Sequence, residues 1–194
     1  MLGRGRSILA ALALFFPLQV GLSFVLPAVA AGSDPQAGMW SGGAGLGFLG
    51  HTPDGAAEFG IAGHAEYFLT DRLSVGPLAQ YAGTGNDFLF GLSGQARYWW
   101  PLPGMDGRTK LVVQGGLGFV RAGITDTDSN TSHTFTSFVV PLGVGLDYAL
   151  TNRLALTADF LLNVTALGKD VRAGGREFDL HTNVMPALYL GVRF

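Results

Sequence analysis

The chain has 194 residues, about the length of one domain, and contains no cysteine, which excludes a disulfide framework, a thiol nucleophile and a thiolate metal site. Only 13% of the residues are charged, whereas 48% are hydrophobic. Soluble domains usually carry about 25% charged residues, so this composition suits a water-exposed surface poorly, and the apolar content excludes disorder. A formal net charge of −2 gives no electrostatic reason to expect nucleic-acid binding.

Residues 1–30 have the pattern of an export signal. Arg4 and Arg6 supply a positive start, an apolar run covers 8–29, and Ala28-Val29-Ala30 has the small-x-small pattern of a cleavage site. The alternative is a membrane-anchoring helix, because the run is long enough to span a bilayer. Two prolines and a glutamine interrupt the run and no basic cluster follows it, so we expect cleavage.

After the signal, apolar residues occupy every second position in a series of short segments, which is the period of a β-strand. The first four segments cover 40–48, 59–67, 73–81 and 88–100. Residues typical of turns and polar loops separate them, at 53–55, 70–72 and 83–87.

Four further segments with the same alternation follow. They cover 111–119, 138–148, 154–164 and 184–194, and the connections between them lie at 101–109, 123–134, 151–153 and 168–179. Eight segments of about ten residues, joined alternately by long and short connections, are typical of a transmembrane barrel. The sequence therefore predicts an all-β, eight-stranded antiparallel up-and-down barrel over 38–194, preceded by a short periplasmic segment at 31–37.

The charged residues of the predicted strands avoid the apolar face. Glu66, Arg97, Asp147, Asp159 and Arg193 all share the face that is rich in glycine and serine. A soluble eight-stranded barrel has the reverse pattern, apolar inside and polar outside. Because Arg or Lys on a lipid face costs about 2–4 kcal/mol at the bilayer midplane, the apolar face is predicted to contact lipid.

The opposite face is predicted to place a polar network in the lumen. Its members are His64, Glu66, Gln80, Gln95, Arg97, Asp147, Asp159, Asn163, His181 and Arg193. The interior of an eight-stranded barrel is just wide enough for side chains, so a structural network of paired charges is the main interpretation. A proton or ion path is the alternative, since many lumen-facing glycines leave room.

Aromatic residues cluster near the short turns and the termini. The predicted membrane-interface set is Trp40, Tyr67, Trp99, Trp100, Tyr148 and Tyr189. Trp and Tyr concentrate at membrane interfaces, and in this class the short turns are periplasmic. Both termini are therefore expected in the periplasm. Three prolines, Pro77, Pro141 and Pro186, are predicted to mark bulges or strand ends, because each lacks a ladder donor.

The last strand ends in an aromatic residue, with Leu188, Leu190, Val192 and Phe194 on one face. Together with the signal, the eight segments and the similar turn segments 67–73 and 148–154, this resembles the small outer-membrane β-barrel family, the OmpA/OmpX-like and opacity-type proteins. The resemblance implies integral insertion in a bacterial outer membrane, with lipid and the barrel-assembly machinery, which reads the last strand, as partners. The longer members' peptidoglycan-binding domain is not expected.

For function, the sequence predicts a monomer with a structural or surface-interaction role through four outer loops, at 50–58, 82–87, 122–134 and 167–179. No catalysis, cofactor or metal is expected. A narrow channel and a lipid-A-modifying enzyme are the alternatives. The enzyme hypothesis rests on His133 beside Ser132, but adjacent strand residues point to opposite faces. The segment 126–130 resembles the start of a calcium loop but lacks the later Gly and Glu.

Overall fold

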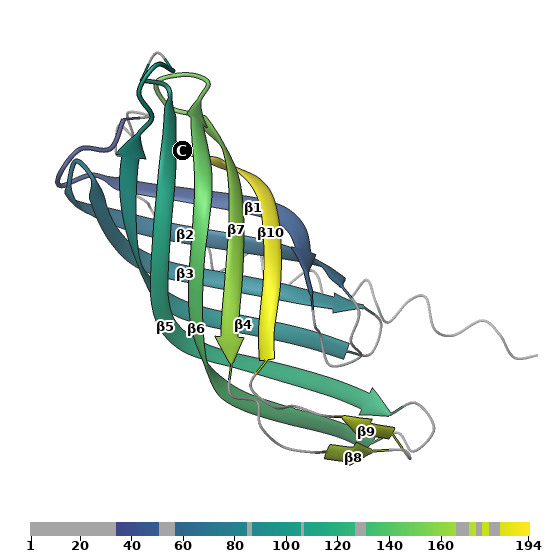
Figure 1. Cartoon of the computed structure of the whole chain (residues 1–194). Coiled ribbons are helices and arrows are strands. Elements are labelled where there is room, and N and C mark those ends of the chain that lie inside the picture. The colour runs from purple at the N-terminus through teal and green to yellow at the C-terminus, as the bar shows by residue number, and fades with distance from the viewer. Residues whose placement is uncertain are drawn as a thin grey trace, which may run out of the picture. The chain divides into compact units, whose positions relative to one another are not determined.

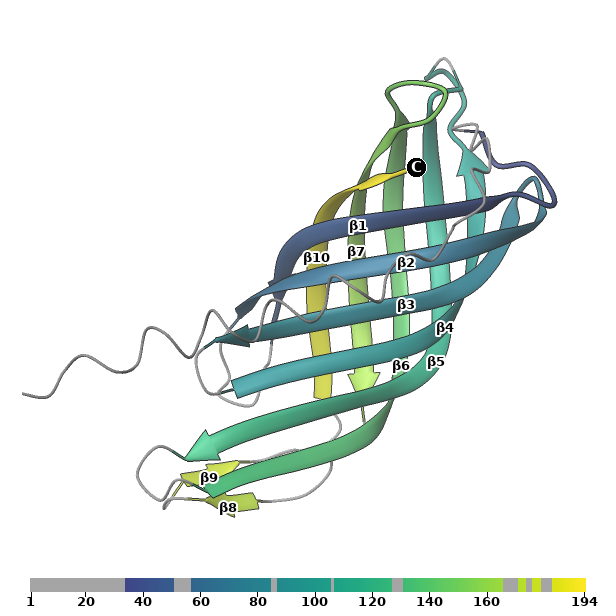
Figure 2. The same cartoon turned by 180° about the vertical axis from the view of Figure 1, so that it is seen from behind.

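The computed structural model describes residues 34–50, 57–84, 87–105, 107–126, 131–165, 171–173, 176–178 and 183–194. The predicted signal segment lies outside these ranges. Eight of the described strands form a closed barrel, and Figures 1 and 2 show how they are arranged. Their bounds are β1 Trp40–Leu49, β2 Glu58–Thr70, β3 Leu73–Thr84, β4 Asp87–Pro101, β5 Thr109–Asp126, β6 Thr131–Ala149, β7 Ala155–Thr165 and β10 Asn183–Arg193.

The strands close on themselves in the order β1-β10-β7-β6-β5-β4-β3-β2, and every neighbouring pair is antiparallel. The predicted eight-stranded antiparallel barrel is therefore confirmed. The closing seam joins β1 to β10, from Gly43 opposite Arg193 to Leu49 opposite Ala187. In the connection between β7 and β10, β8 (Val171–Ala173) and β9 (Arg176–Phe178) form a separate two-stranded sheet.

The two faces of the strands differ as the alternation predicted. Large apolar side chains on the outer face are exposed, among them Leu46, Leu142, Leu146, Leu156 and Phe160. On the inner face, Glu66, Arg97, Asp147 and Arg193 are buried. The barrel thus carries its hydrophobic surface outside and its charges inside. Within the described ranges, no helix has the length and apolar character needed to cross a membrane.

The prolines do not act as predicted. Pro77 and Pro141 each leave a gap in one ladder, β2–β3 and β5–β6 respectively, but the register is the same on both sides of each gap. Pro186 keeps its place opposite Leu162 in an unbroken β10–β7 ladder. The only register shift in the described pairing lies between Phe68 and Thr70, next to a short turn. A missing donor therefore interrupts pairing locally without changing which face a side chain occupies.

Two of the four predicted outer loops are shorter than predicted. Much of the predicted loop 122–134 is strand, because β5 and β6 remain paired from Thr109 opposite Tyr148 out to Asp126 opposite Thr131. Likewise β3 runs to Thr84 and β4 starts at Asp87, inside the predicted loop 82–87. Threonine and other β-branched residues favour strands even where the sequence is polar, so polarity alone was a poor guide to strand ends.

Candidate functional site: the interior of the barrel

The inward side chains form two chemically different layers. A charged network, which comprises Ser41, Glu66, Ser74, Arg97, Trp99, Asp147 and Arg193, lies near the strand ends that adjoin the short turns and the carboxyl terminus. An apolar plug lies toward the long connections, and its buried residues are Leu49, Leu78, Ala82, Leu89, Val120, Val139, Leu161, Met185, Ala187 and Tyr189. The lumen is therefore not polar along its whole length.

Arg193, the last residue of β10, is the centre of the charged network. It donates from Nε to Asp147 Oδ2 at 2.8 Å and from Nη2 to Asp147 Oδ1 at 3.0 Å. It also donates from Nη1 to Ser41 Oγ at 3.4 Å, and its guanidinium carbon lies 4.9 Å from the centre of the Trp99 ring. A planar guanidinium matches a carboxylate in this two-bond geometry and stacks on aromatic faces. One side chain of the last strand thus contacts β1, β4 and β6.

The network continues from Trp99 to Glu66. Trp99 Nε1 donates to Ser74 Oγ at 3.0 Å, and Ser74 Oγ donates to Glu66 Oε2 at 2.6 Å. Glu66 also has two positively charged or chargeable neighbours, Arg97 Nη1 at 3.9 Å and His64 Nε2 at 3.8 Å. These two distances are too long for hydrogen bonds, so the contacts are electrostatic. Buried charges are tolerated when they have such partners.

In the middle of the barrel, large inward side chains cover glycines on the neighbouring strand. His64 is opposite Gly43, Gln95 is opposite Gly116, and Asp159 is opposite Gly145. A Cβ built on Gly43 would lie 2.5 Å from His64 Cε1, and one on Gly116 would lie 2.6 Å from Gln95 Nε2. The glycines therefore do not leave open space, because the residues opposite them occupy it.

The space that remains in this region is small. A cavity of about 10 Å³ lies among His64, Arg97, Gln114, Asp159 and Tyr189. A single water needs roughly 10–15 Å³ of such volume. The cavity is thus at the limit of one water molecule, and it does not provide a continuous aqueous path.

The apolar plug adds a second barrier. Leu49 is the last residue of β1, and Leu89 and Met185 lie near the starts of β4 and β10, so the plug occupies the end with the long connections. A few polar side chains are buried at this end too, including Glu58, Gln80, Asn163 and Thr165. Asn163 Nδ2 donates to the Met185 carbonyl at 3.4 Å. Ion passage would require these apolar side chains to move.

Most of the predicted lumen residues lie inside. Glu66, Gln80, Gln95, Arg97, Asp147, Asn163 and Arg193 are buried, and the side chains of His64 and Asp159 line the small cavity. Asp159 accepts a hydrogen bond from Gln114 Nε2 at 3.3 Å, so the contact that the structure gives it is with an amide. His181 lies outside the described residues.

The predicted interface aromatics divide into two groups. Trp40, Trp100 and Tyr148 are exposed on the outer face, and Tyr67 is half-buried with its ring 5.2 Å from that of Trp40. Trp99 and Tyr189 are each only 2% exposed. The prediction is wrong for these two, because side chains inside the barrel cannot contact lipid. Trp99 and Trp100 are adjacent, so only one of them can face outward.

The last strand carries its predicted residues on the outer face. Leu188, Leu190, Val192 and Phe194 are exposed there. The backbone of Phe194 exchanges hydrogen bonds with Gly42, and its carbonyl also accepts from Ser41 Oγ at 3.0 Å. The carboxyl terminus is therefore fixed to β1 by main-chain contacts.

One buried lysine and its partner were not anticipated. Lys110 is buried at the short-turn end, and its Nζ donates to Asp34 Oδ1 at 2.7 Å. The segment before β1 is further held by Ala37 N, which donates to Asp71 Oδ1 at 3.0 Å. Lys110 shares the inward parity of Val112 and Gln114, so its position could have been predicted from the alternation. Asp34 lies outside the strands, so the alternation of strand residues could not predict its contact with Lys110.

The residues considered for catalysis or metal binding lie in a part of the chain where the structure describes no side chains. Nothing is described of the side chains of Ser132 and His133, and 127–130 lie outside the described residues. Only the backbone pairing of Ser132 with Thr125 and of His133 with Ile124 is established there.

Comparison with known proteins agrees with this architecture. The family model described as "Outer membrane protein beta-barrel domain" matches residues 16–184. Neisserial surface protein A is similar in structure, with 17% sequence identity and a TM-score of 0.59 over 79% of this chain and 94% of that chain. The N-terminal β-barrel domain of Pseudomonas aeruginosa OprF has 19% identity and a TM-score of 0.56 over 82% and 98%. No curated protein sequence gives a significant match.

Proposed function

Because the chain belongs to the outer membrane β-barrel protein family, we propose that its filled barrel is a membrane anchor that presents an interaction surface outside the cell. In this proposal the long connections are extracellular and both termini are periplasmic. The role is structural or interactive, without a cofactor and without catalysis, and the chain acts as a monomer surrounded by outer-membrane lipid. The barrel-assembly machinery would read the exposed residues of β10.

The observation that carries the proposal is the length of the β5–β6 hairpin. The β4–β5 ladder ends at Phe88 opposite Gly123, and the β6–β7 ladder ends at Val139 opposite Thr165. Beyond those points β5 and β6 pair only with each other among the barrel strands, as far as Asp126 opposite Thr131. The eight residues of β6 at 131–138 extend roughly 27 Å at the usual rise per residue. Figures 1 and 2 show this hairpin extending past the ends of the other strands.

The chemistry of the hairpin suits an aqueous interaction surface. Its β6 arm is rich in hydroxyl side chains, and Thr134 and Thr136 are exposed. On the opposite face, Phe135 packs against the apolar plug. The hairpin is therefore attached to the core of the barrel on one face and presents hydrogen-bonding groups on the other. Paired strands that project from a rigid scaffold hold such groups in fixed positions.

The interior supports an anchor over the alternative of a narrow channel. Arg193 and Asp147 form two hydrogen bonds across the charged network, and the cavity beside the network has a volume of about 10 Å³. The apolar plug fills the barrel on the side of the long connections. A static pore needs a continuous wet path, and the described interior residues give none. The lipid-A enzyme alternative has no comparable support from the described residues.

Topology can be tested with single cysteines, because the chain has none of its own. Thr136→Cys, on the hairpin, should react with a membrane-impermeant maleimide on intact cells. Asn152→Cys, in the short turn between β6 and β7, should react only after the outer membrane is opened. The reverse labelling pattern would contradict the proposed orientation.

A test of the interaction role requires a variant that lacks the projecting hairpin but keeps the barrel intact. Replacing residues 124–133 with an Asn-Gly turn joins Gly123 to Thr134, which are already paired, in a connection suited to a two-residue hairpin. We expect the shortened protein to keep its heat-modifiable gel mobility while the expressing cells lose adhesion to cultured epithelial cells. Equal adhesion by both strains would contradict an adhesive hairpin.

The enzyme alternative is tested by the mass of lipid A. If lipid A has the same mass in cells that express the wild-type chain, in cells that express His133→Ala and in cells that express neither, the enzyme alternative is excluded.

A further inference from the structure

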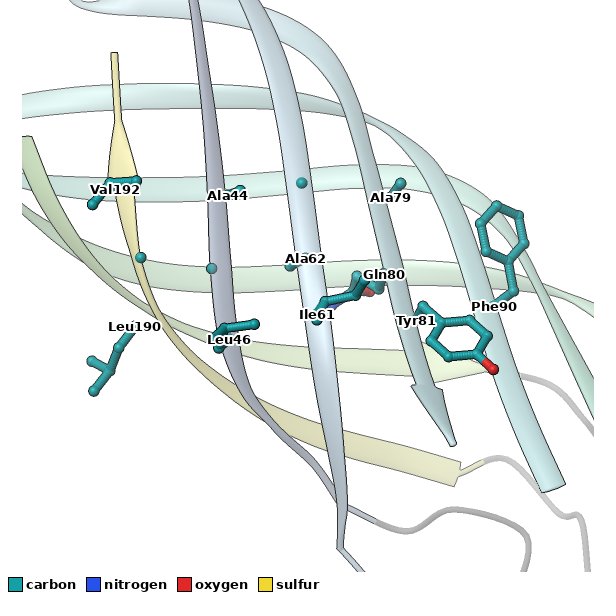
Figure 3. A pocket seen from close by; sticks show the side chains of 13 residues that line it. Ala44, Leu46, Ile61, Ala62, Ala79, Gln80, Tyr81, Phe90, Leu190 and Val192 are labelled. Atoms are coloured by element: carbon teal, nitrogen blue, oxygen red, sulfur yellow. The ribbon is translucent and has the colours of Figure 1, made fainter. Parts of the chain in front are cut away.

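The end of the barrel that adjoins the short turns contains a polar pocket. Its volume is about 700 Å³, which is within the range of pockets that hold small molecules, roughly 300–1,000 Å³. Its lining includes two acidic residues, two cations and one tryptophan: Asp34, Asp71, Arg72, Lys110 and Trp99. The pocket differs from a hollow on the outer face, which Figure 3 shows with mainly apolar side chains and which belongs to the surface predicted to contact lipid.

Lys110 supplies a buried positive charge to this pocket. Its side chain is only 8% exposed, and its Nζ donates to Asp34 Oδ1 at 2.7 Å. A buried ammonium group needs an anionic or hydrogen-bonding partner, because it has lost most of its own hydration. The Asp34 side chain is 74% exposed, so its carboxylate would lose little by leaving Lys110 for water. The lysine therefore requires an anion more strongly than Asp34 requires the lysine.

Arg72 is a second cation in the pocket, and it has no ionic partner. It is exposed in the turn between β2 and β3, and no residue in the described part of the chain forms an ion pair with its guanidinium. Its backbone is held in place, because its carbonyl accepts from Trp99 N at 2.8 Å. When Asp34 leaves, two cations and the single carboxylate of Asp71 remain in the lining. This surplus of one positive charge suits a ligand with one negative charge.

The segment that carries Asp34 is attached to the barrel mainly at its other end. In this amino-terminal strap (34–39), Gly38 N donates to the Phe68 carbonyl at 2.8 Å. The outer half is held by the contact of Asp34 and by one hydrogen bond from Ala37 N to a side chain of the β2–β3 turn. Gly38 has a φ of 86°, which favours glycine and turns the chain between the two halves. The outer half can therefore move away while the inner half stays paired with β2.

From the buried lysine, the unpaired arginine and the exposed Asp34, we propose that this pocket binds the carboxylate group of a small organic anion. Asp34 occupies the site until the anion replaces it. The carboxylate of the ligand then accepts from Lys110 Nζ as Asp34 does, and Arg72 supplies the additional positive charge. The proposed orientation of the barrel places this pocket in the periplasm, but binding itself does not depend on that orientation.

The alternative is that the contact between Asp34 and Lys110 only fastens the strap. The two possibilities differ in the effect of removing the Asp34 carboxylate. A ligand that must displace an internal competitor binds with an apparent affinity that is reduced by the fraction of time the site is free. Asp34→Asn should therefore strengthen binding if the site takes a carboxylate. A structural fastening gives no reason for a carboxylate to bind in either form.

Acetate is a suitable probe, because it carries the same group as Asp34. The chain has three tryptophans, so Trp40→Phe with Trp100→Phe leaves only Trp99, which lines the pocket, as a fluorescent reporter. Acetate is exchanged for chloride at constant ionic strength and pH, with the protein folded in detergent. We expect a saturable change in Trp99 emission. In this background, Asp34→Asn should lower the half-saturating acetate concentration several-fold, and Lys110→Met should abolish the saturable change.

Two arginines in similar turns provide a matched control. The backbone N of Arg72 donates to the hydroxyl of Thr70, and that of Arg153 donates in the same way to Thr151. Arg72 lines the pocket and Arg153 does not. Arg72→Gln should therefore raise the half-saturating acetate concentration, whereas Arg153→Gln should leave it unchanged. Heat-modifiable gel mobility verifies that each variant is folded.

Three outcomes would overturn the proposal. The absence of a saturable response in both the parent and Asp34→Asn would show that the pocket does not bind a carboxylate. The same half-saturating concentration in these two proteins would show that Asp34 does not compete for the site. A response that persists in Lys110→Met and in Arg72→Gln would place the bound acetate elsewhere.

Discussion

Arg193 donates two hydrogen bonds to Asp147, of 2.8 and 3.0 Å, across the interior of the barrel. The two residues lie on β10 and β6, which are separated by β7 in the strand order. Both are almost completely buried, at 2% and 1% exposure. The pair therefore reaches past β7 and connects the last strand to the strand beyond its neighbour.

Removing one member of this pair should destabilise the barrel strongly. Arg193→Ala leaves the Asp147 carboxylate buried without its main partner, and breaking a buried ion pair costs about 3–5 kcal/mol. Urea unfolding in lipid vesicles, followed by tryptophan fluorescence, measures this loss. Arg153→Ala, at an exposed turn position, is the control and should change stability little. Similar midpoints for the two variants would show that the pair is energetically unimportant.

Adding a methyl group inside the barrel should be costly where a large neighbour covers a glycine. In Gly43→Ala the new Cβ would lie 2.5 Å from His64 Cε1 and 2.8 Å from the Val192 carbonyl oxygen. Overpacking of this kind costs about 1–3 kcal/mol. Gly63→Ala is the matched control on the next strand, because its Cβ points to open space on the outer face. If both alanine variants unfold at the wild-type urea concentration, the interior is not tightly packed at Gly43.

The three tryptophans should report different environments. Trp40 and Trp100 are 51% and 57% exposed on the outer face, whereas Trp99 stacks on Arg193 in the interior. In vesicles of brominated phospholipid, Trp99→Phe retains the two outer tryptophans, and its emission should be quenched. The double variant Trp40→Phe with Trp100→Phe retains Trp99 alone, and its emission should persist. Strong quenching of Trp99 would place that ring in lipid and contradict the described register.

The filled lumen should not conduct ions. The wild-type protein in planar bilayers is expected to show no discrete conductance steps. Replacing Leu78, Leu89, Val139 and Leu161 of the apolar plug with alanine removes only one of the two barriers. This variant should also remain silent, because the region around His64 and Arg97 still leaves a cavity of only about 10 Å³. Discrete conductance steps in this variant would show that the apolar plug is the sole barrier. Steady wild-type conductance would favour the channel alternative.

The sequence alone predicted the strand number and the assignment of faces, because both depend on a local rule. Lipid excludes charge from one face, so positions such as Leu142 and Asp147 carry a clear signal. The same rule identified Arg97 and Arg193 as internal cations. It could not identify which carboxylate each one contacts, since Asp147 lies 46 positions from Arg193 and the pairing depends on how far the strands are staggered around the barrel.

Other predictions were wrong because the alternation of faces was applied too simply. Inward residues were expected to be polar, yet Leu49, Leu78 and Leu161 form part of an apolar plug. The glycines were expected to leave space, but cross-strand neighbours such as His64 and Asp159 fill it, and this pairing depends on register. Trp99 was assigned to the membrane interface because it is a tryptophan near a strand end, although its position in the alternation indicated the interior.

The central claim is that lipid surrounds the outer face of this barrel. Nitroxide labels at Leu142→Cys and Leu156→Cys in reconstituted vesicles test it directly, with Asn152→Cys in a short turn as the water-exposed reference. We expect frequent collisions of the first two labels with oxygen, which dissolves in lipid, and few with a water-soluble nickel chelate, whereas the reference label should show the opposite. Nickel accessibility at positions 142 and 156 equal to that of the reference would contradict it.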